Sequence, residues 1–477
     1  MGEEISSSHF SRKDFEIFSQ RLTEETSLLK TWFQQDLFAD APLTAGFELE
    51  AWLIDQACSP MPENEKLIES TGDLFVVPEL SKFNIELNGT PRVLELNALS
   101  MMQSELDENW HQCNEVAEKL GGQMSMIGIL PTVSDSELTL ENMSGFIRYR
   151  ALNEQVLKSR RGRPLMLNID GRQSLHTRHN DVMLESAATS FQIHLQVNLA
   201  DSTRFYNAAL IASAPVVAAA ANSPYLFDRD LWDETRIPLF EQAVAINGNK
   251  SGYCGNVQRV SFGAGYIENS LYEVFSENRD CFPVLLAAHQ DEHTKCMHHV
   301  RLHNGTIWRW NRPLIGFDED GSPHLRIEHR VVPAGPTPVD CFANAAFFYG
   351  LVVALAARKT APESTLDFQN AKQNFYNAAR SGLNSTVNWI DGKNRAMHQL
   401  IHDELVPLAR EGLDSMNISS EDIARYLDII SDRVCSQLNG AAWQRAYKQK
   451  NSCDMRELTS VYQMNSLTGM PVHEWSL

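Results

Sequence analysis

The chain has 477 residues, of which 43% are hydrophobic and 21% charged, so it has enough apolar material for a large folded core. It carries 41 Lys and Arg against 61 Asp and Glu, and a formal net charge of −20 argues against nucleic acid as a partner. The eight cysteines include no CxxC or other close pair, so neither a zinc site nor a disulfide framework is indicated.

The first fifteen residues, MGEEISSSHFSRKDF, contain no apolar run of the kind found in a secretory signal. The chain is therefore expected in the cytoplasm, without membrane contact. The sequence motifs described next are the basis for predicting its small-molecule partners.

Helices and strands are predicted to alternate along most of the chain. Apolar side chains recur at helical spacing in residues 10–36, 106–120, 207–221 and 342–357. Strands are predicted at residues 45–53, 83–87, 92–96, 188–197, 306–310 and 324–331. The turn sequence Asn88-Gly89-Thr90-Pro91 predicts that the second and third strands form a hairpin. From about residue 339 to 448 the pattern is helical, which indicates an α+β core with a helical C-terminal part.

Four of the predicted segments, one of them the two-stranded hairpin, place polar side chains on one face of a pleated strand. These residues are Glu48 and Glu50; Glu86 and Glu95; Gln192, His194 and Gln196; and Arg326, Glu328 and Arg330. Taken singly, each group is typical of a solvated strand or a surface ion-pair ladder. If the strands share a sheet, however, these carboxylates lie close together on one face and repel one another unless bound cations neutralise their charge. Divalent cations with oxygen ligands, bridged to a polyphosphate, meet that requirement.

The same segments resemble those of the glutamate–cysteine ligase and carboxylate–amine ligase superfamily. The matching stretches are GFELEAWL from residue 46, FNIELNG and VLELN within 83–97, RPLMLNIDG from 163, SFQIHLQVN from 190, ANSPYLFDRDLWDETR from 221, IWRWNRP from 307 and LRIEHR from 325. The resemblance covers about residues 40–360, and its ordered set of motifs is more specific to the superfamily than to any substrate.

The resemblance implies an α+β fold of the glutamine synthetase type. An antiparallel sheet would form an open funnel, with helices outside it and a helical C-terminal extension. The expected organisation is an N-terminal helical segment at 1–40, a catalytic domain at 41–360 and a helical region at 361–477.

The resemblance also implies roles for individual residues. Glu48 and Glu50 would each hold one of two magnesium ions, with Glu86 and Glu95 completing the first site. Glu328 and one of Gln192 and His194 would complete the second, while the other member of that pair and Arg326 would contact the nucleotide. The implied roles of the remaining arginines are contact with the γ-phosphate for Arg330, with the phosphates and the acyl phosphate for Arg309 and Arg312, and with an amino-acid carboxylate for Arg236.

The implied activity is that of an ATP- and Mg²⁺-dependent ligase, with Mn²⁺ as a possible substitute. It would activate a carboxylate as an acyl phosphate, with glutamate and an amine such as cysteine as substrates. Two alternatives are a phosphotransferase on the same scaffold, of the guanidino-kinase type, and a non-catalytic nucleotide-binding regulator. Tyr149 could contact a substrate or simply pack. The cluster His293, Cys296, His298 and His299 is expected to be a polar loop or helix surface.

Overall fold

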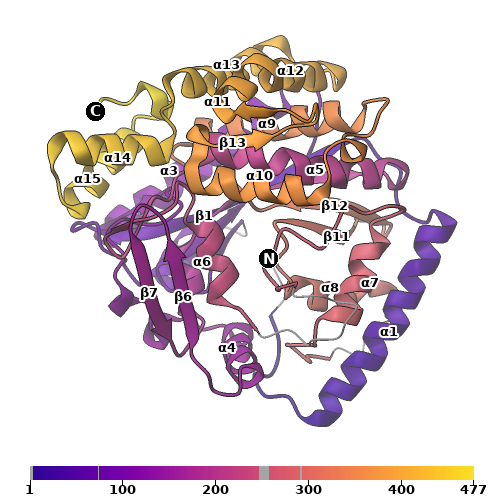
Figure 1. Cartoon of the computed structure of the whole chain (residues 1–477). Coiled ribbons are helices and arrows are strands. Elements are labelled where there is room, and N and C mark those ends of the chain that lie inside the picture. The colour runs from indigo at the N-terminus through magenta and orange to yellow at the C-terminus, as the bar shows by residue number, and fades with distance from the viewer. Residues whose placement is uncertain (1–3, 73–74, 247–256, 290–292) are drawn as a thin grey trace.

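The computed structural model describes residues 4–72, 75–246, 257–289 and 293–477 (Figure 1). An antiparallel sheet lies at its centre, with the strand order β11-β12-β8-β1-β3-β2, and it curls into a half-barrel. These strands are β1 (Thr44–Asp55), β2 (Val76–Pro78), β3 (Asn84–Asn88), β8 (Phe191–Val197), β11 (Asn311–Phe317) and β12 (Pro323–His329). Two further strands, β4 (Arg92–Val93) and β5 (Gly122–Ser125), pair with β1. The long central strand β1 therefore organises the whole sheet.

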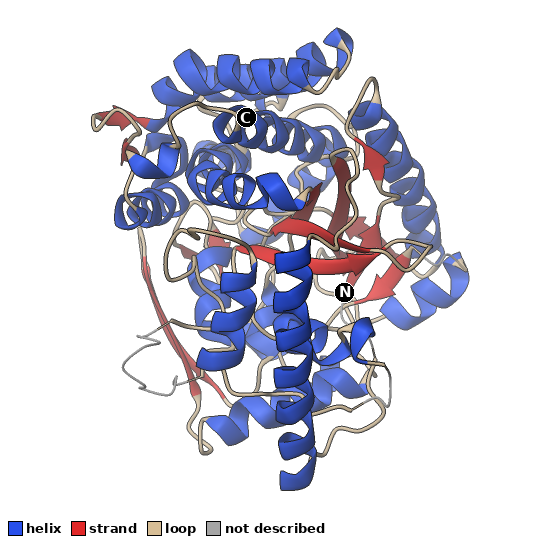
Figure 2. Ribbon diagram, turned by 90° about the vertical axis from the view of Figure 1, so that its right-hand side faces the viewer, coloured by secondary structure: helices blue, strands red, loops and turns tan. Residues whose placement is uncertain are grey.

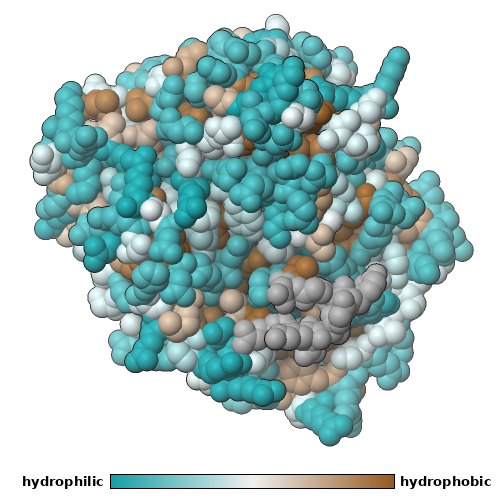
Figure 3. Space-filling view, in the orientation of Figure 1, coloured by the Kyte–Doolittle hydropathy of each residue, from teal (hydrophilic) through white to brown (hydrophobic). Residues whose placement is uncertain are grey.

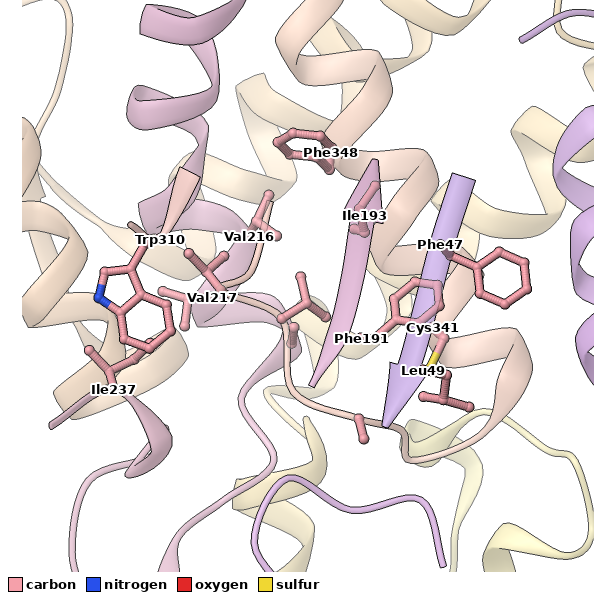
Figure 4. Packing of buried hydrophobic residues seen from close by; sticks show 14 of the residues in the cluster. Phe47, Leu49, Phe191, Ile193, Val216, Val217, Ile237, Trp310, Cys341 and Phe348 are labelled. Carbon is pink, nitrogen blue, oxygen red and sulfur yellow. The ribbon is translucent and has the colours of Figure 1, made fainter. Parts of the chain in front are cut away.

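One face of the sheet packs against two helices, α5 (Leu199–Ala220) and α9 (Pro338–Ala356). Phe47 of β1 and Phe191 of β8, both labelled in Figure 4, pack on Phe342 of α9, with ring centroids 5.3 and 5.7 Å from that of Phe342. The Tyr349 hydroxyl of α9 donates to the carbonyl oxygen of His194 at 3.1 Å. Burial of this face leaves the polar side chains of β1 and β8 to point the opposite way.

Helix α9 is, in the described part of the chain, the one helix long and apolar enough to cross a membrane. Of its most apolar window, 89% is buried inside the protein. It was predicted as a buried helix, and the structure confirms this.

Most of the other helices lie outside the sheet (Figure 2). They include α1 (Arg12–Gln35), α3 (Ala98–Lys119), α4 (Ile147–Ser159), α6 (Arg236–Ala243), α7 (Tyr272–Cys281) and α8 (His298–Gly305). Helix α1 begins with a capping box between Ser11 and Asp14, and it packs along α7 and α8. The molecular face in Figure 3 is predominantly hydrophilic, as the composition predicts.

The C-terminal helices are α10 (Phe368–Ser381), α12 (Val406–Ser415), α13 (Ser420–Ser436), α14 (Gly440–Asn451) and α15 (Met455–Ser466). Helices α12 and α13 pack directly on α9, whereas α10 packs on α5. The buried Arg433 of α13 donates to Asp340 at 2.7 Å and to Asn344 at 2.6 Å, both in α9. This region is therefore fixed to the core by polar contacts as well as by packing. A domain boundary at residue 360 remains a proposal.

Three expectations from the sequence are wrong. Strands β3 and β4 do not form a hairpin with each other, because both pair with β1, at Glu48–Trp52 and Thr44–Ala45. The strand predicted at 306–310 begins instead at Asn311, since residues 306–310 form a turn and an extended connection. Six cysteines are free thiols, but Cys281 is disulfide-bonded.

Candidate active site

Strand register brings the polar side chains of five strands, β1, β3, β8, β11 and β12, together on the face opposite α9. Glu48 lies opposite Gln192 and Glu50 opposite Glu86 in the pairing of β1 with its neighbours. Glu328 lies opposite His194 on one side and opposite Arg312 on the other. The predicted gathering of carboxylates, imidazole and arginines on one sheet face is thus present.

Glu48, His194 and Glu328 form a first group whose potential ligand atoms all lie within 4.8 Å of one another. His194 Nε2 lies 3.3 Å from Glu48 Oε1 and 4.0 Å from Glu328 Oε1. His194 is buried, and neither ring nitrogen has a partner with hydrogen-bond geometry among the described residues. Gln192, the other candidate of that pair, is not in this group.

Glu50, Glu79 and Glu86 form a second group within the same distance limit. Ser190 N–H donates to Glu50 at 2.7 Å, and Asn88 Nδ2 donates to Glu86 at 3.0 Å. No basic side chain in the described ranges forms an ion pair with these three carboxylates. Glu79 was not predicted from the sequence, because it follows β2 at Pro78 and lies outside any alternating pattern.

Glu95 was predicted in this group, but the structure places it elsewhere. Glu95 is exposed and lies just beyond the short strand β4. Leu94 N–H bonds to the carbonyl of Leu43, so Glu95 lies near the start of β1, about 20 Å along the strand from Glu48 at ~3.3 Å per residue. The predicted extension of the strand to residue 96 failed, and the chain turns into α3 instead.

Two arginines bind the carboxylates of the sheet face. Arg312 holds Glu328 with two hydrogen bonds, from Nε at 2.7 Å and from Nη2 at 2.8 Å. Arg330 donates from Nη1 to Glu328 at 3.3 Å and also to the amide oxygen of Gln192. Gln192 in turn donates to Glu50 at 2.9 Å. Gln192 therefore connects the arginine to the second carboxylate group.

Most of the polar residues of this sheet face line a cavity of about 260 Å³, although His194 does not. Its polar wall contains the predicted residues Glu48, Glu50, Glu86, Gln192, Arg312, Arg326, Glu328 and Arg330. Glu79, Glu185, Arg148, Tyr149, His298 and Arg301 also line it, and were not assigned to a site. The carboxylates and the cationic side chains share one cavity.

Burial and mutual repulsion raise the pKa of several of these carboxyl groups. Burial, together with the neighbouring Glu48 carboxylate, raises the pKa of Glu86 to about 7. Burial and the charges of Glu86 and Glu50 raise the pKa of Glu79 well above its usual range. Burial opposes ionisation of Glu328 too, but Arg312 and Arg330 lower its pKa to about 2. Arg312 and Arg330 therefore outweigh burial at Glu328, whereas burial and repulsion between the carboxylates prevail at Glu79 and Glu86.

Arg236 and Arg309 were predicted in the site, but neither lines the cavity. Arg236 is buried behind the sheet face, where it donates to Glu234 and to the carbonyls of Val331 and Arg330, each at 3.2 Å. Arg309 is buried against α7, where it donates to Asn278 at 2.9 Å. Each guanidinium is held by contacts inside the protein, which for Arg309 include an ion pair with Glu277 at 3.1 Å, so these arginines lie outside the cavity and support the residues around it.

Both carboxylate groups fit divalent cations by their donor sets. The second group offers only carboxylate oxygens, which Mg²⁺ prefers, and a cation there would offset the repulsion that raises the pKa of Glu79 and Glu86. The first group adds a buried imidazole nitrogen that has no hydrogen-bond geometry with its carboxylate neighbours, a ligand that manganese-type metals also accept.

The cluster at 293–299 is a polar surface only in part, because His293 and Cys296 are exposed as expected but the two later histidines are not. His298 and His299 are buried, and His299 Nδ1 lies 2.7 Å from Glu25 of α1. This contact between His299 and Glu25 connects α8 to α1.

Comparison with known proteins relates this geometry to a family. The model of glutamate-cysteine ligase family 2 matches residues 44–463. A solved glutamate–cysteine ligase from Francisella tularensis, in complex with AMP, aligns with a TM-score of 0.58 at 10% identity, covering 92% of this chain and 90% of that one. A bifunctional glutathione synthetase from Pasteurella multocida aligns with a TM-score of 0.56 at 9% identity, covering 94% of this chain and 55% of that one. At such identities the two structures are alike in fold, and no curated protein sequence matches the chain.

Proposed function

The chain belongs to glutamate-cysteine ligase family 2, and we propose that it is an ATP- and divalent-cation-dependent ligase that joins a carboxylic acid to an amine. The proposed acid is glutamate, and the proposed amine is cysteine or a similar amino acid. One observation carries the proposal: five carboxylates from two candidate metal-binding groups line a single cavity together with Arg330, and His194 completes the first group from beside that cavity. The AMP complex of the Francisella ligase supports the choice of nucleotide.

In the proposed reaction, ATP phosphorylates the acid and the amine then displaces phosphate from the acyl phosphate. Arg330 lies where a guanidinium can bind the transferring phosphoryl group, and its planar fork suits an oxyanion. Gln192 and Glu328 hold that fork in place. Arg312 and Arg326 add positive charge to the same wall.

Magnesium ions, held by Glu50, Glu79 and Glu86 and by Glu48, His194 and Glu328, would supply charge neutralisation for the polyphosphate. Without such charge, the second carboxylate group repels an anionic nucleotide. The chain's own contribution is to position these six side chains on adjacent strands, with Arg236 supporting the backbone of Arg330 from behind.

A phosphate-release assay with ATP, magnesium and pairs of acids and amines tests the proposal. We expect phosphate and an amide identified by mass spectrometry, and hydroxylamine should trap the activated acid as a hydroxamate. ADP formed without phosphate, hydroxamate or amide would instead identify a phosphotransferase. No turnover with any pair, and no stabilisation by ATP with magnesium, would favour a regulatory protein.

A further inference from the structure

One carboxylate in the cavity has no place in the metal groups. Glu185 belongs to the 3-10 helix η3 (Met183–Ala187), which precedes strand β8. Its side chain lines the cavity, whereas its neighbours Leu184 and Ser186 are buried in the protein. Glu185 is thus the residue of this short helix that faces the substrate space.

The segment around Glu185 is held firmly. Met183 and Leu184 are fully buried, and η3 packs on α6. Asn153 of α4 accepts a hydrogen bond from Val182 N–H at 3.1 Å, and Ser186 Oγ donates to Met183 O at 2.7 Å. A side chain on such a segment has a defined position, which a reacting group requires.

No described residue donates a hydrogen bond to the Glu185 carboxylate or forms an ion pair with it. Four charged or titratable groups interact electrostatically with the Glu185 carboxylate. They are Glu50 of β1, Arg330 after β12, Glu79 after β2 and Tyr149 of α4. Two of these four are carboxyl groups, Arg330 is a cation, and burial keeps the Tyr149 hydroxyl neutral. The Glu185 carboxylate, which has no donor of its own among the described residues, can therefore accept hydrogen bonds from an ammonium group. Because Arg330 is one of its neighbours, Glu185 faces the place where the acyl phosphate would form.

We propose that Glu185 binds the ammonium group of the amine substrate and accepts its proton before the amine attacks. This inference rests on the proposed function, and it defines the second substrate as a protonated primary amine. Burial and the charge of Glu50 raise the pKa of Glu185 to about 8, which brings its basicity closer to that of an amine.

The proposed step balances in atoms and charge. One proton passes from R–NH₃⁺ to the Glu185 carboxylate, and the freed nitrogen lone pair forms the C–N bond to the acyl carbon. The C–O bond to phosphate breaks, and phosphate leaves with the electron pair. Phosphate takes a second proton from the nitrogen, and Glu185 releases its proton to solvent, so the products are the amide, HPO₄²⁻ and one H⁺.

Replacing Glu185 by glutamine separates the two half-reactions. Hydroxylamine is already neutral at pH 7 and needs no base, so the Glu185→Gln protein should form hydroxamate from ATP, magnesium and glutamate at the wild-type rate. Amide formation with the substrate amine, cysteine being tried first, should fall by about 10²- to 10⁴-fold, the usual contribution of a general base. Glu185→Asp should retain part of the amide rate. Asp181→Asn is the matched control, because Asp181 caps the same segment by accepting from Met183 N–H at 3.0 Å, and it should leave the ratio of amide to hydroxamate unchanged.

Equal loss of hydroxamate and amide in a folded Glu185→Gln protein would overturn the inference, because Glu185 would then serve phosphorylation or the acid. An unchanged amide rate would also overturn it. If glutamine prevents folding, the Glu185→Asp protein decides by the same ratio. A wild-type protein that forms neither product would reject the proposed ligase function itself, which is a different outcome.

Discussion

Arg330 contacts both Glu328 and Gln192, so its guanidinium is positioned before any substrate arrives. Arg330→Lys would keep the positive charge but remove the planar fork. We expect kcat to fall about a hundredfold, equivalent to about 3 kcal/mol, with a smaller change in ATP binding. Steady-state kinetics with ATP as the varied substrate measures both quantities.

The control for that substitution is Arg309→Lys. Arg309 is buried against α7 and does not line the cavity, so its replacement should lower stability more than kcat. A loss of kcat as large as that of Arg330→Lys would mean that Arg309 acts in the reaction after all.

Glu79 and Glu95 provide a matched pair of acidic residues. Glu79→Gln removes one of three carboxylates from a candidate metal group, so the magnesium concentration needed for half-maximal turnover should rise at least about tenfold. Glu95→Gln, at an exposed position, should leave this magnesium concentration unchanged. Titration of activity with Mg²⁺ distinguishes the two. A larger rise in that magnesium concentration for Glu95→Gln than for Glu79→Gln would place Glu95 in the metal site after all.

At the scale of elements, the ion pair between α9 and α13 connects the C-terminal helices to the core. Arg433→Leu would leave Asp340 buried without its partner, and we expect the free energy of unfolding to fall by about 3–5 kcal/mol. The exposed pair Arg410–Asp428 lies on the same group of helices, and Arg410→Ala should cost less than about 1 kcal/mol. Denaturant unfolding compares the two proteins. A similar small loss in both would show that α13 is held by packing alone.

For the whole molecule, the acidic cavity links stability to pH. Folding raises the pKa of Glu86 to about 7 and that of Glu185 to about 8, above the value of about 4.3 in an unfolded chain. The folded state therefore holds more protons, so the stability that these groups contribute is complete below about pH 4 and is lost as pH rises through 7 and 8. The contribution of Glu328 to stability changes with pH in the opposite direction, because folding lowers its pKa to about 2. That contribution is lost only under acid conditions.

We expect the melting temperature of the metal-free protein to fall between pH 6 and pH 9. Magnesium should flatten this dependence, because a bound cation favours the ionised carboxylates. Thermal unfolding in chelator and in excess magnesium measures the difference. The same slope under both conditions would argue against cation binding at the carboxylate groups.

Alternation in the sequence was sufficient to find the strands that hold the site. Glu48, Glu50, Gln192, His194, Arg326, Glu328 and Arg330 were assigned to one sheet face because a strand alternates its side chains whatever its neighbours are. The buried helix α9 was equally clear from its apolar composition. The resemblance of the ordered motifs then predicted the family and the open antiparallel sheet.

Other features depend on how distant segments meet. Glu79 enters the site because β2 pairs with β3, and Glu185 because η3 packs on α6, and neither packing follows from a local pattern. The hairpin prediction failed because β1 is long enough to pair with both β3 and β4. Arg236 and Arg309 have the residue type of a binding site, but tertiary contacts bury them and occupy their donors. Periodicity along the chain thus determined which side chains share a face, whereas strand pairing and burial decided which of them reach the cavity.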